Sequence, residues 1–307
     1  MDGALILDKP KGITSHDAVA AARRLLHEKR IGHGGTLDPL ATGVLVLLIG
    51  RATRLSRLIM ASDKTYEARI VFGITTDTYD VTGAVTSRSS LKPALADVEQ
   101  ALASLRGSYL QEPPAFSAKR VQGRRAYDLA RRNEAVELRP VPVSVSHLGV
   151  TAFDEQRLTV VLTCSAGFYV RSFAHALGKL AGPGACLEEL RRTRSGDFAV
   201  ADAVRLEDRV SPEELERRVI PMEGLLRSLP MRIVTAEGRQ WVTHGRALSR
   251  SQLREGDADP GELLPLPGTG STAGAPEAWV RLMDEDGRLI ALGQVTNATL
   301  HPSVVLI

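Results

Sequence analysis

Cysteine is almost absent from this sequence: the 307 residues include two, Cys164 and Cys186. Their spacing fits neither a disulfide framework nor a metal site, so we expect two buried thiols in a reducing compartment. Long hydrophobic runs are also lacking, because no stretch approaches the roughly 18 uncharged apolar residues that a membrane helix needs. The opening residues MDGALILDKP carry an acid where a signal peptide would carry basic residues. We therefore predict a cytoplasmic protein that does not enter a membrane.

A strong net charge is missing as well, since the chain carries a formal charge of +3. The charges are nevertheless unevenly distributed. Residues 105–141 contain eight Lys or Arg against four acids, whereas residues 230–307 contain seven Arg against nine acids. Basic clustering is typical of polyanion binding, but a run of charge is more often a solvated face. Composition alone leaves both interpretations open.

Apolar periodicity predicts a chain in which strands cluster and helices do not alternate with them regularly. With 43% hydrophobic residues, the chain can bury a sizeable core. Strands are expected at residues 4–7, 65–73, 143–153 and 158–164, and helices at 15–26, 93–105, 170–181 and 211–218. This order favours the α+β class, with a mixed, largely antiparallel central sheet and flanking helices, over a doubly wound parallel sheet.

A second domain is expected at the C-terminal end. The boundary falls near residue 230, after the acidic helix, and divides the chain into residues 1–229 and 230–307. The segments WVRLM and LIALG form a predicted hairpin around Asp286-Gly287, a strong turn signal. Residues 255–276 are rich in Gly, Pro, Asp and Ser, so we expect a flexible loop there.

Asp38 is the one acid in the segment GHGGTLDPLATGVL. Its simplest interpretation is a turn residue, because Asp-Pro favours turns, and the same holds for Asp77 and Asp80 in GITTDTYDVTG. If Asp38 is buried it needs a cationic partner, and Arg171 in CSAGFYVR is a candidate, although a surface arginine is the simpler reading. Tyr66 lies on the apolar face of its strand, where core packing is the ordinary explanation. These alternatives stay open when each residue is considered alone.

Several motifs considered together are far more specific than any one of them. They read DKPKGITSHDAV, GHGGTLDPLATGVL, KTYEARIVFGITTDTYDVTG, PPAFSAKRVQGRRAYDLAR, CSAGFYVRSFAHALG and LEELRRTRSGDF. In this order and at these separations they resemble the bacterial tRNA pseudouridine synthase B family, from about Ala4 to about Val204. The resemblance implies the pseudouridine synthase fold with a small PUA-like RNA-binding β domain at the C-terminal end. Gly34 stands where the family commonly has Thr, which bears on surrounding contacts more than on the reaction.

The resemblance implies an isomerase that converts uridine 55 in the T-arm of tRNA to pseudouridine. The base leaves its ribose, turns and rejoins through C5, so no atoms are gained and neither a cofactor nor a metal is required. Asp38 matches the catalytic aspartate, which acts as a nucleophile or base near the ribose in a site closed to water. The target uridine would have to flip out of the folded T-loop to reach this carboxylate.

The same resemblance gives roles to residues around the carboxylate. Arg171 would pair with Asp38 and orient it. Tyr66 would stack on the target base and take part in proton removal from C5. Leu190 would form an apolar wall of the base pocket, with Tyr169 as a packing neighbour in the same RNA-binding site.

RNA contacts are implied on three further segments. His33 matches a histidine that contacts the RNA, although with a pKa near ~6.5 it could instead serve as a general acid or base. Residues 111–141 match an insertion that closes on the RNA arm, in which Lys119, Arg124 and Arg125 would bind phosphates. Residues 182–197, which carry Arg191, are expected to form a mobile loop over the site.

The implied partner is tRNA, recognised by the shape of its T-arm, and we expect a monomer that needs neither a protein partner nor a membrane. Three alternatives remain: a non-catalytic tRNA-binding or tRNA-folding protein on the same scaffold, a synthase dependent on a guide RNA and protein partners, and a glycoside hydrolase. The insertion favours a self-sufficient enzyme. A single well-placed acid disfavours glycoside hydrolysis, which usually employs two.

Overall fold

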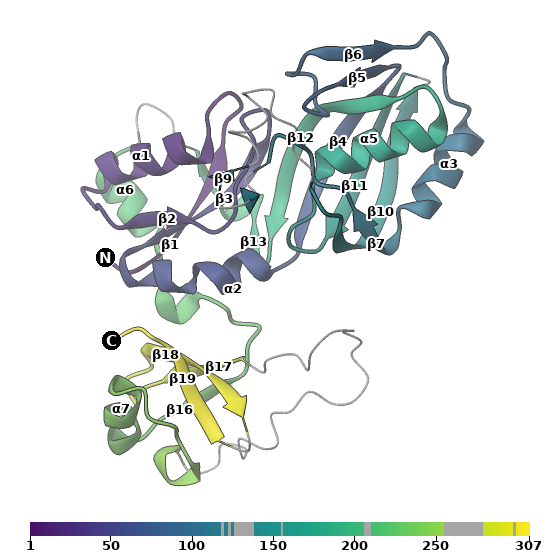
Figure 1. Cartoon of the computed structure of the whole chain (residues 1–307). Coiled ribbons are helices and arrows are strands. Elements are labelled where there is room, and N and C mark those ends of the chain that lie inside the picture. Colours follow the sequence, from purple (N-terminus) through teal and green to yellow (C-terminus); the bar gives the residue numbers. More distant parts are fainter. Residues whose placement is uncertain are drawn as a thin grey trace.

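Two β-sheets organise the protein, one above the other in Figure 1. The computed structural model describes residues 1–117, 138–154, 156–205, 210–254, 279–296 and 299–307, and the backbone of 120–121 and 124–125. No helix in these ranges is long and apolar enough to cross a membrane.

The helices and strands of the described ranges have the following bounds. The α-helices are α1 (Ser15–Leu25), α2 (Ser56–Ala61), α3 (Leu95–Ser104), α5 (Val170–Ala181), α6 (Pro212–Arg217) and α7 (Ala236–Thr243). The strands of the large sheet are β1 (Gly3–Lys9), β2 (Ile31–His33), β3 (Thr42–Ile49), β4 (Lys64–Phe72), β7 (Gly107–Gln111), β10 (Val141–Asp154), β11 (Arg157–Cys164), β12 (Ala185–Ser195), β13 (Phe198–Ala199), β14 (Val204–Arg205) and β15 (Ile220–Pro221). The smaller sheets contain β5 (Ile74–Thr76), β6 (Val85–Arg88), β8 (Arg120–Val121), β9 (Arg124–Arg125), β16 (Met231–Ile233), β17 (Trp279–Met283), β18 (Leu289–Thr296) and β19 (Thr299–Val305).

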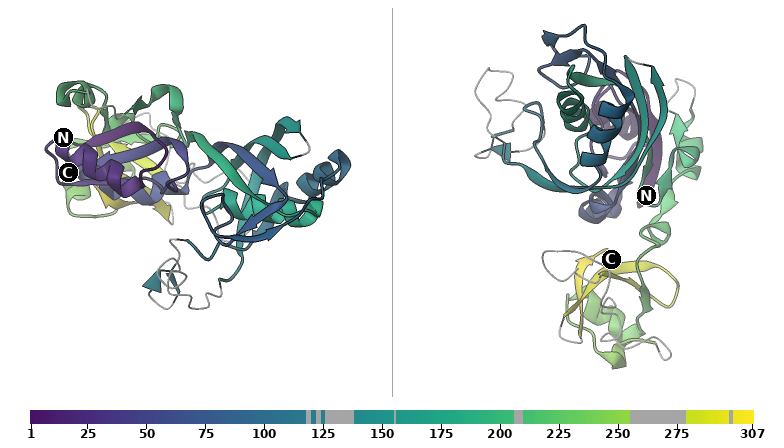
Figure 2. Two further views of the ribbon diagram at one scale, coloured as in Figure 1. Left: turned by 90° about the horizontal axis from the view of Figure 1, so that it is seen from above. Right: turned by 90° about the vertical axis from the view of Figure 1, so that its right-hand side faces the viewer.

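The large sheet has the order β14-β1-β3-β12-β4-β11-β10-β7, with β2, β13 and β15 pairing to its side. The β1–β14 and β3–β12 pairs are parallel, and the other pairs along this path are antiparallel. The α+β class with a mixed, largely antiparallel sheet is therefore confirmed. Helices α5 and α3 pack against each other in the hollow of the curved sheet, as the right-hand view of Figure 2 shows.

Strand β3 forms the middle of the hydrophobic core. Its residues from Val44 to Ile49 are all apolar, as suits a strand with both faces buried. Leu45 and Leu47 belong to the core beneath α1 and α5, whereas Val44 and Val46 belong to a second core on the opposite face. The sequence analysis missed this strand, since a continuous apolar run has no period that separates strand from helix.

Helix α1 begins at Ser15, as the sequence predicts, and is capped by the preceding residue. Thr14 is the N-cap, and it forms a capping box with Asp17. Ser15 is thereby free to point inward, where its hydroxyl accepts a hydrogen bond from Leu37 N and donates one to Leu37 O. The first turn of α1 thus supports the loop that carries Asp38.

The prediction of a mobile loop at residues 182–197 is wrong. Most of this segment is β12, which lies between β3 and β4 in the centre of the large sheet. The run of arginines suggested solvent exposure, but alternation along a strand sends successive side chains to opposite faces. Two bulges opposite β4 further obscure the period of two.

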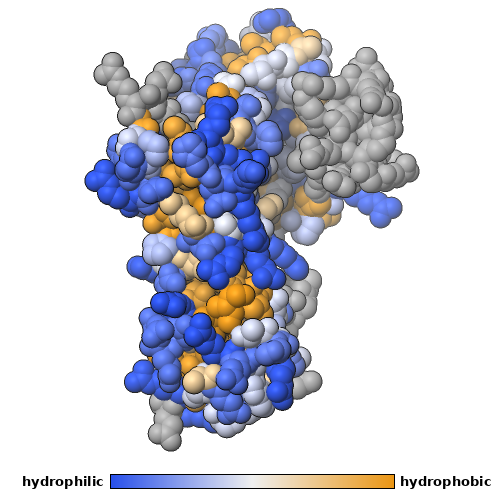
Figure 3. Space-filling model, turned by 90° about the vertical axis from the view of Figure 1, so that its left-hand side faces the viewer, coloured by the Kyte–Doolittle hydropathy of each residue, from blue (hydrophilic) through white to orange (hydrophobic). Residues whose placement is uncertain are grey.

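The C-terminal sheet has the order β16-β17-β18-β19 and contains the predicted hairpin, with its turn at Asp284–Gly287. Its apolar residues Leu289, Leu292 and Leu306 share one core with the outward face of β1 and β3. Hydrophobic side chains also gather on the surface just below the narrow middle of the molecule (Figure 3). The predicted loop at residues 255–276 lies outside the described residues, and the boundary at residue 230 stays a prediction.

Gly178 of α5 provides a test of this packing. An added Cβ would collide with the backbone at Gly184 and Ala185, where β12 begins. Alanine gains about 1 kcal/mol over glycine in a helix, but forced overpacking against backbone costs about 1–3 kcal/mol. We expect Gly178→Ala to lower the free energy of unfolding in urea. Lys179→Ala, on the exposed side of the same helix, serves as the control, and equal stability of both variants would contradict the packing argument.

Candidate active site

Five of the predicted site residues line one cavity of about 420 Å³. They are Asp38, Tyr66, Tyr169, Arg171 and Leu190. The cavity lies where the β2–β3 loop, β4, β12 and the start of α5 meet. Residues more than a hundred positions apart in the sequence are thus brought together, as the motifs predicted.

The centre of the cavity is an ion pair between Asp38 and Arg171. The guanidinium donates from Nε to Asp38 Oδ2 at 2.8 Å and from Nη2 to Oδ1 at 3.3 Å. The Arg171 side chain is 7% exposed, and that of Asp38 is 37% exposed. The fork geometry fixes the plane of the carboxylate, and the guanidinium compensates its charge. Asp38 is only partly buried, because the carboxylate faces the open cavity.

Two further donors of Arg171 are also occupied. Nη1 donates to Thr78 O and Nη2 to Phe116 O, each at 3.0 Å, and Asp80 Oδ2 lies 3.8 Å from Nε. Asp80 is buried, and its Oδ1 accepts hydrogen bonds from Thr82 N and from the hydroxyls of Thr78 and Thr82. The guanidinium therefore has acceptors on every side, which leaves it one orientation.

The loop that carries Asp38 is held from beneath by Arg192. This buried side chain donates from Nε to Val44 O at 2.7 Å, from Nη2 to Gly35 O at 3.2 Å and from Nη1 to Thr36 O at 3.4 Å. Gly35 has a φ of 130°, a conformation that favours glycine. A loop with so many carbonyl groups turned inward needs a planar cation with several donors, and Arg192 supplies it.

Tyr66 and Leu190 form the apolar side of the cavity. Both are buried on adjacent strands, since Ala68 of β4 pairs with Leu190 and Tyr66 pairs with Arg192. Burial raises the pKa of the Tyr66 phenol, and the neighbouring Arg192 opposes this shift. Tyr169 is the N-cap residue of α5, and its backbone exchanges two hydrogen bonds with the Gln111 side chain.

His33 lies on β2 and is not among the residues that line the cavity. Burial and the nearby Arg192 lower the pKa of its imidazole. The next residue, Gly34, is close-packed, because an added Cβ would lie 2.6 Å from Ile59 Cγ2. This contact explains why a threonine would not fit at Gly34 in this chain.

Arg191 is separated from the cavity by the sheet. It pairs with Glu67 in the ladder, so its side chain lies on the face opposite to Tyr66 and Leu190. Its guanidinium binds Asp8, with Nη2 2.8 Å from Oδ2. The prediction that Arg191 belongs to a loop over the site is therefore wrong. Lys119 and the side chains of Arg124 and Arg125 lie outside the described residues, and β8 and β9 form a short hairpin there.

Sequence reasoning missed the supporting role of three residues. Asp80 was interpreted as a turn residue, which it is, but its second oxygen faces Arg171. The hydroxyls of Thr78 and Thr82 on either side were the available signal, because they satisfy a buried carboxylate locally. Arg192 lies in the segment that was predicted to be a loop, and no pattern in the sequence indicates that Lys9 is fully buried.

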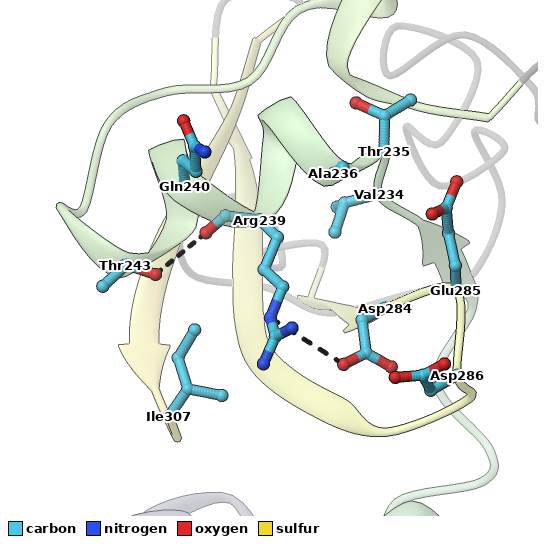
Figure 4. A pocket seen from close by; sticks show the side chains of 10 residues that line it. All are labelled: Val234, Thr235, Ala236, Arg239, Gln240, Thr243, Asp284, Glu285, Asp286 and Ile307. Carbon is cyan, nitrogen blue, oxygen red and sulfur yellow. Dashed lines mark hydrogen bonds and ion pairs between the residues drawn. The ribbon is translucent and has the colours of Figure 1, made fainter.

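A larger cavity of about 530 Å³ lies in the C-terminal sheet, away from these residues. Figure 4 shows that α7 faces the β17–β18 turn across it, with Asp284, Glu285 and Asp286 on the turn side. Arg239 Nε lies 3.9 Å from Asp284 Oδ2. Three acids against one arginine make this cavity a poor phosphate site.

Lys9 provides a pH test of the buried charges behind Asp38. Its Nζ donates to Pro10 O and Ile13 O, and burial lowers its pKa from 10.5 to about 8, with Asp38 opposing the shift. Between pH 8 and 10.5 the unfolded chain binds the proton more tightly, so folding gains stability as pH rises through this window. Relative to that of Lys9→Met, the free energy of unfolding of the wild type should rise by at most about 3 kcal/mol between pH 7.5 and 10.5.

Urea unfolding at both pH values measures this difference. Lys11→Met, which removes an exposed lysine two residues away, controls for the lost charge. If the free energy of unfolding of the wild type does not rise with pH relative to that of Lys9→Met, the lowered pKa of Lys9 is contradicted.

Comparisons with known proteins agree with the assembled motifs. A family model described as the TruB family pseudouridylate synthase N-terminal domain matches residues 23–170. The tRNA pseudouridylate synthase B C-terminal domain matches residues 171–227. The tRNA pseudouridine synthase B of Solibacter usitatus is 40% identical over 311 residues and that of Aquifex aeolicus 37% over 310 residues, each covering 100% of both chains.

Solved structures show the same architecture. A Cbf5-Nop10-Gar1 complex contains a chain that is 25% identical with a TM-score of 0.70, covering 99% of this chain and 85% of that one. An H/ACA RNP bound to a substrate RNA containing 2'-deoxyuridine gives the same TM-score and coverage at 23% identity, which supports the fold alone. With matched family domains and full-length relatives of one name, this chain belongs to the TruB family of tRNA pseudouridine synthases.

Proposed function

We propose that this chain is a stand-alone isomerase that converts uridine 55 in the T-arm of tRNA to pseudouridine, with Asp38 as its catalytic carboxylate. The observation that carries the proposal is the fork between Asp38 and the buried Arg171, which opens into a cavity beside Tyr66. A carboxylate in a fixed plane at the wall of a nucleoside-sized cavity suits attack on, or proton removal from, a ribose.

The proposed chemistry balances without any external reagent. The N1–C1′ bond of the uridine breaks, the base turns, and a C5–C1′ bond forms. The proton on C5 leaves and N1 gains one, so no electrons are exchanged. Asp38 acts at the ribose as nucleophile or base. Tyr66 would take part in the removal of the C5 proton. Because burial raises the pKa of its phenol, the phenol is protonated at neutral pH and is not the final acceptor, so the C5 proton ends in the solvent.

The uridine must leave its stack before it can reach this cavity. Eversion costs a few kcal/mol, and stacking on one aromatic ring returns about 1–3 kcal/mol. Tyr66 with Leu190 therefore covers part of the free energy, and contacts to the vacated RNA must supply the remainder. Closure of the cavity around the base also retains the detached uracil and excludes water.

The remaining contacts with tRNA are proposed for the segment at 111–141 and for the C-terminal part. Lys119, Arg124 and Arg125 would bind phosphates and fix the register without reading sequence. His33, at the end of β2 before the Asp38 loop, would contact RNA with a neutral imidazole, because burial lowers its pKa. Residues 230–307 would form a PUA-like domain that binds RNA away from its acidic cavity. We propose a cytoplasmic monomer that needs no protein partner.

Two other functions remain as test outcomes. A non-catalytic tRNA-folding protein would bind tRNA without changing it. A synthase that depends on a guide RNA would be inactive on tRNA alone, a possibility that the fold shared with the Cbf5-Nop10-Gar1 complex keeps relevant. The two hydrogen bonds between Arg171 and the Asp38 carboxylate favour catalysis over simple binding. A surface that only binds RNA gains nothing from a negative carboxylate oriented toward the cavity.

Release of tritium tests the reaction and the aspartate together. Unmodified tRNA labelled with tritium at uridine C5 should lose one label per molecule to water when incubated with the purified chain. Asp38→Asn should abolish release, because the amide neither attacks nor accepts a proton, while tRNA binding stays within about tenfold.

A transcript with cytidine in place of uridine 55 is the substrate control. It should give no release if the position is correct. Binding without release by the wild type would support the folding protein, and release restored only by added RNA and proteins would support the guide-dependent enzyme.

The basic segment can be tested through the salt dependence of binding. We expect Arg124→Ala with Arg125→Ala to reduce the slope of log affinity against log salt by roughly one to two, according to the number of phosphates released. Arg191→Ala is the matched control, because that guanidinium is bound to Asp8 on the far face of the sheet. An unchanged slope in the double variant would separate the basic segment from the RNA.

A further inference from the structure

The loop between β5 and β6 reaches the active site through a strained residue. Tyr79 has a φ of 64°, a left-handed conformation that is uncommon for a bulky side chain. It lies between Thr78, whose carbonyl accepts from Arg171, and Asp80, whose carboxylate faces the same guanidinium. Strain of this kind persists only where surrounding contacts hold it, and it points to a function for the segment.

The contact that holds Tyr79 is a stack on His175. The ring centroids are 3.9 Å apart and the planes differ by 12°. Burial and the charge of Lys179 lower the pKa of His175, while Glu112 opposes this shift. The stack therefore joins a phenol to a neutral imidazole at neutral pH, and both rings are half-buried.

His175 and Arg171 belong to the same face of α5. They are four positions apart, so one turn of helix separates the stacked ring from the guanidinium. The loop contacts this helix through the ring of Tyr79, the Thr78 carbonyl and the Asp80 carboxylate. On its other side, the Tyr79 carbonyl accepts from Leu187 N, and Val81 N donates to Leu187 O, which attaches the loop to β12.

We propose that the stacked rings of Tyr79 and His175 are a positioning pair, which holds the Thr78 carbonyl and the Asp80 carboxylate against Arg171 and so fixes the guanidinium that orients Asp38. The inference rests on the proposed function of Asp38. It adds residues that touch neither the substrate nor the reacting atoms.

The geometry explains why a stack is needed in addition to the backbone bonds. The bonds to Leu187 attach the loop to β12 and make no contact on the α5 side. The ring packed on His175 supplies such a contact, so it holds the loop against α5 beside the Thr78 and Asp80 contacts to Arg171. A guanidinium that lost the Thr78 and Asp80 acceptors could rotate, and the Asp38 carboxylate would rotate with it.

The experiment compares variants that keep or remove the rings. Tyr79→Asn removes the ring but suits the left-handed backbone, and Tyr79→Phe keeps the ring without the hydroxyl. His175→Ala removes the other ring. We expect the single-turnover rate of tritium release to fall about 10-fold to 100-fold in Tyr79→Asn and in His175→Ala, as a misplacement near 1 Å would produce. Tyr79→Phe should stay within about threefold of the wild type, since stacking depends on the ring.

Two readouts separate positioning from general stability. The affinity for tRNA should be unchanged, so the loss lies in the rate of reaction and not in binding. The double variant Tyr79→Asn with His175→Ala should be no slower than the slower single variant, because each change already removes the whole stack. Phe153→Ala, which deletes an edge contact to Phe72 away from the cavity, is the control for a loss of stability alone.

Each outcome bears on the inference. A wild-type rate in folded Tyr79→Asn, beside an inactive Asp38→Asn, would overturn the positioning role and leave the proposed function intact. Multiplicative losses in the double variant would also overturn it. Tritium release by Asp38→Asn would overturn the proposed function itself. If Tyr79→Asn does not fold, His175→Ala makes the same test from the helix side.

Discussion

The pairing of a half-open carboxylate with a buried guanidinium is the constraint on which the rest of this structure depends. Arg171 is withdrawn from water, so its charge and its N–H groups must be satisfied by protein. Asp38 accepts two of these N–H groups, and the two hydrogen bonds fix the plane of its carboxylate. The Asp38 carboxylate is thereby both the counter-ion of the buried Arg171 and part of the wall of the cavity.

Meeting that constraint requires contributions from distant parts of the chain. The first turn of α1 supplies Ser15, the segment after β7 supplies the Phe116 carbonyl, and the β5–β6 loop supplies Asp80. Arg192 adds a second buried cation beneath the Asp38 loop. The two arginines act differently, since Arg171 binds side chain and backbone around one carboxylate, while Arg192 satisfies carbonyl groups of a glycine-rich turn.

Sequence reasoning predicted the class of fold and the residues with distinctive chemistry. Asp38, Tyr66, Arg171 and Leu190 were identified because their motifs are specific, and they line one cavity. What could not be predicted was the state of residues whose role depends on partners far away. The basic run around Arg191 was predicted to be a loop, because local sequence does not show which groups satisfy its charges. These groups are Asp8 for Arg191 and backbone carbonyls for Arg192. The partial exposure of Asp38 could not be predicted either, since it depends on the shape of the cavity.

The core shared by the two sheets has a consequence for how the chain can change. Leu289, Leu292 and Leu306 belong to the same hydrophobic cluster as Val44 and Val46 on the strand that follows the Asp38 loop. Shortening the chain before residue 279 would therefore remove part of the hydrophobic cluster to which this strand belongs, whatever the C-terminal sheet binds. If the smaller sheet were exchanged for another domain, the apolar residues of the large sheet in this cluster would be exposed to water unless the new domain packed against them. The two sheets are therefore expected to be retained together.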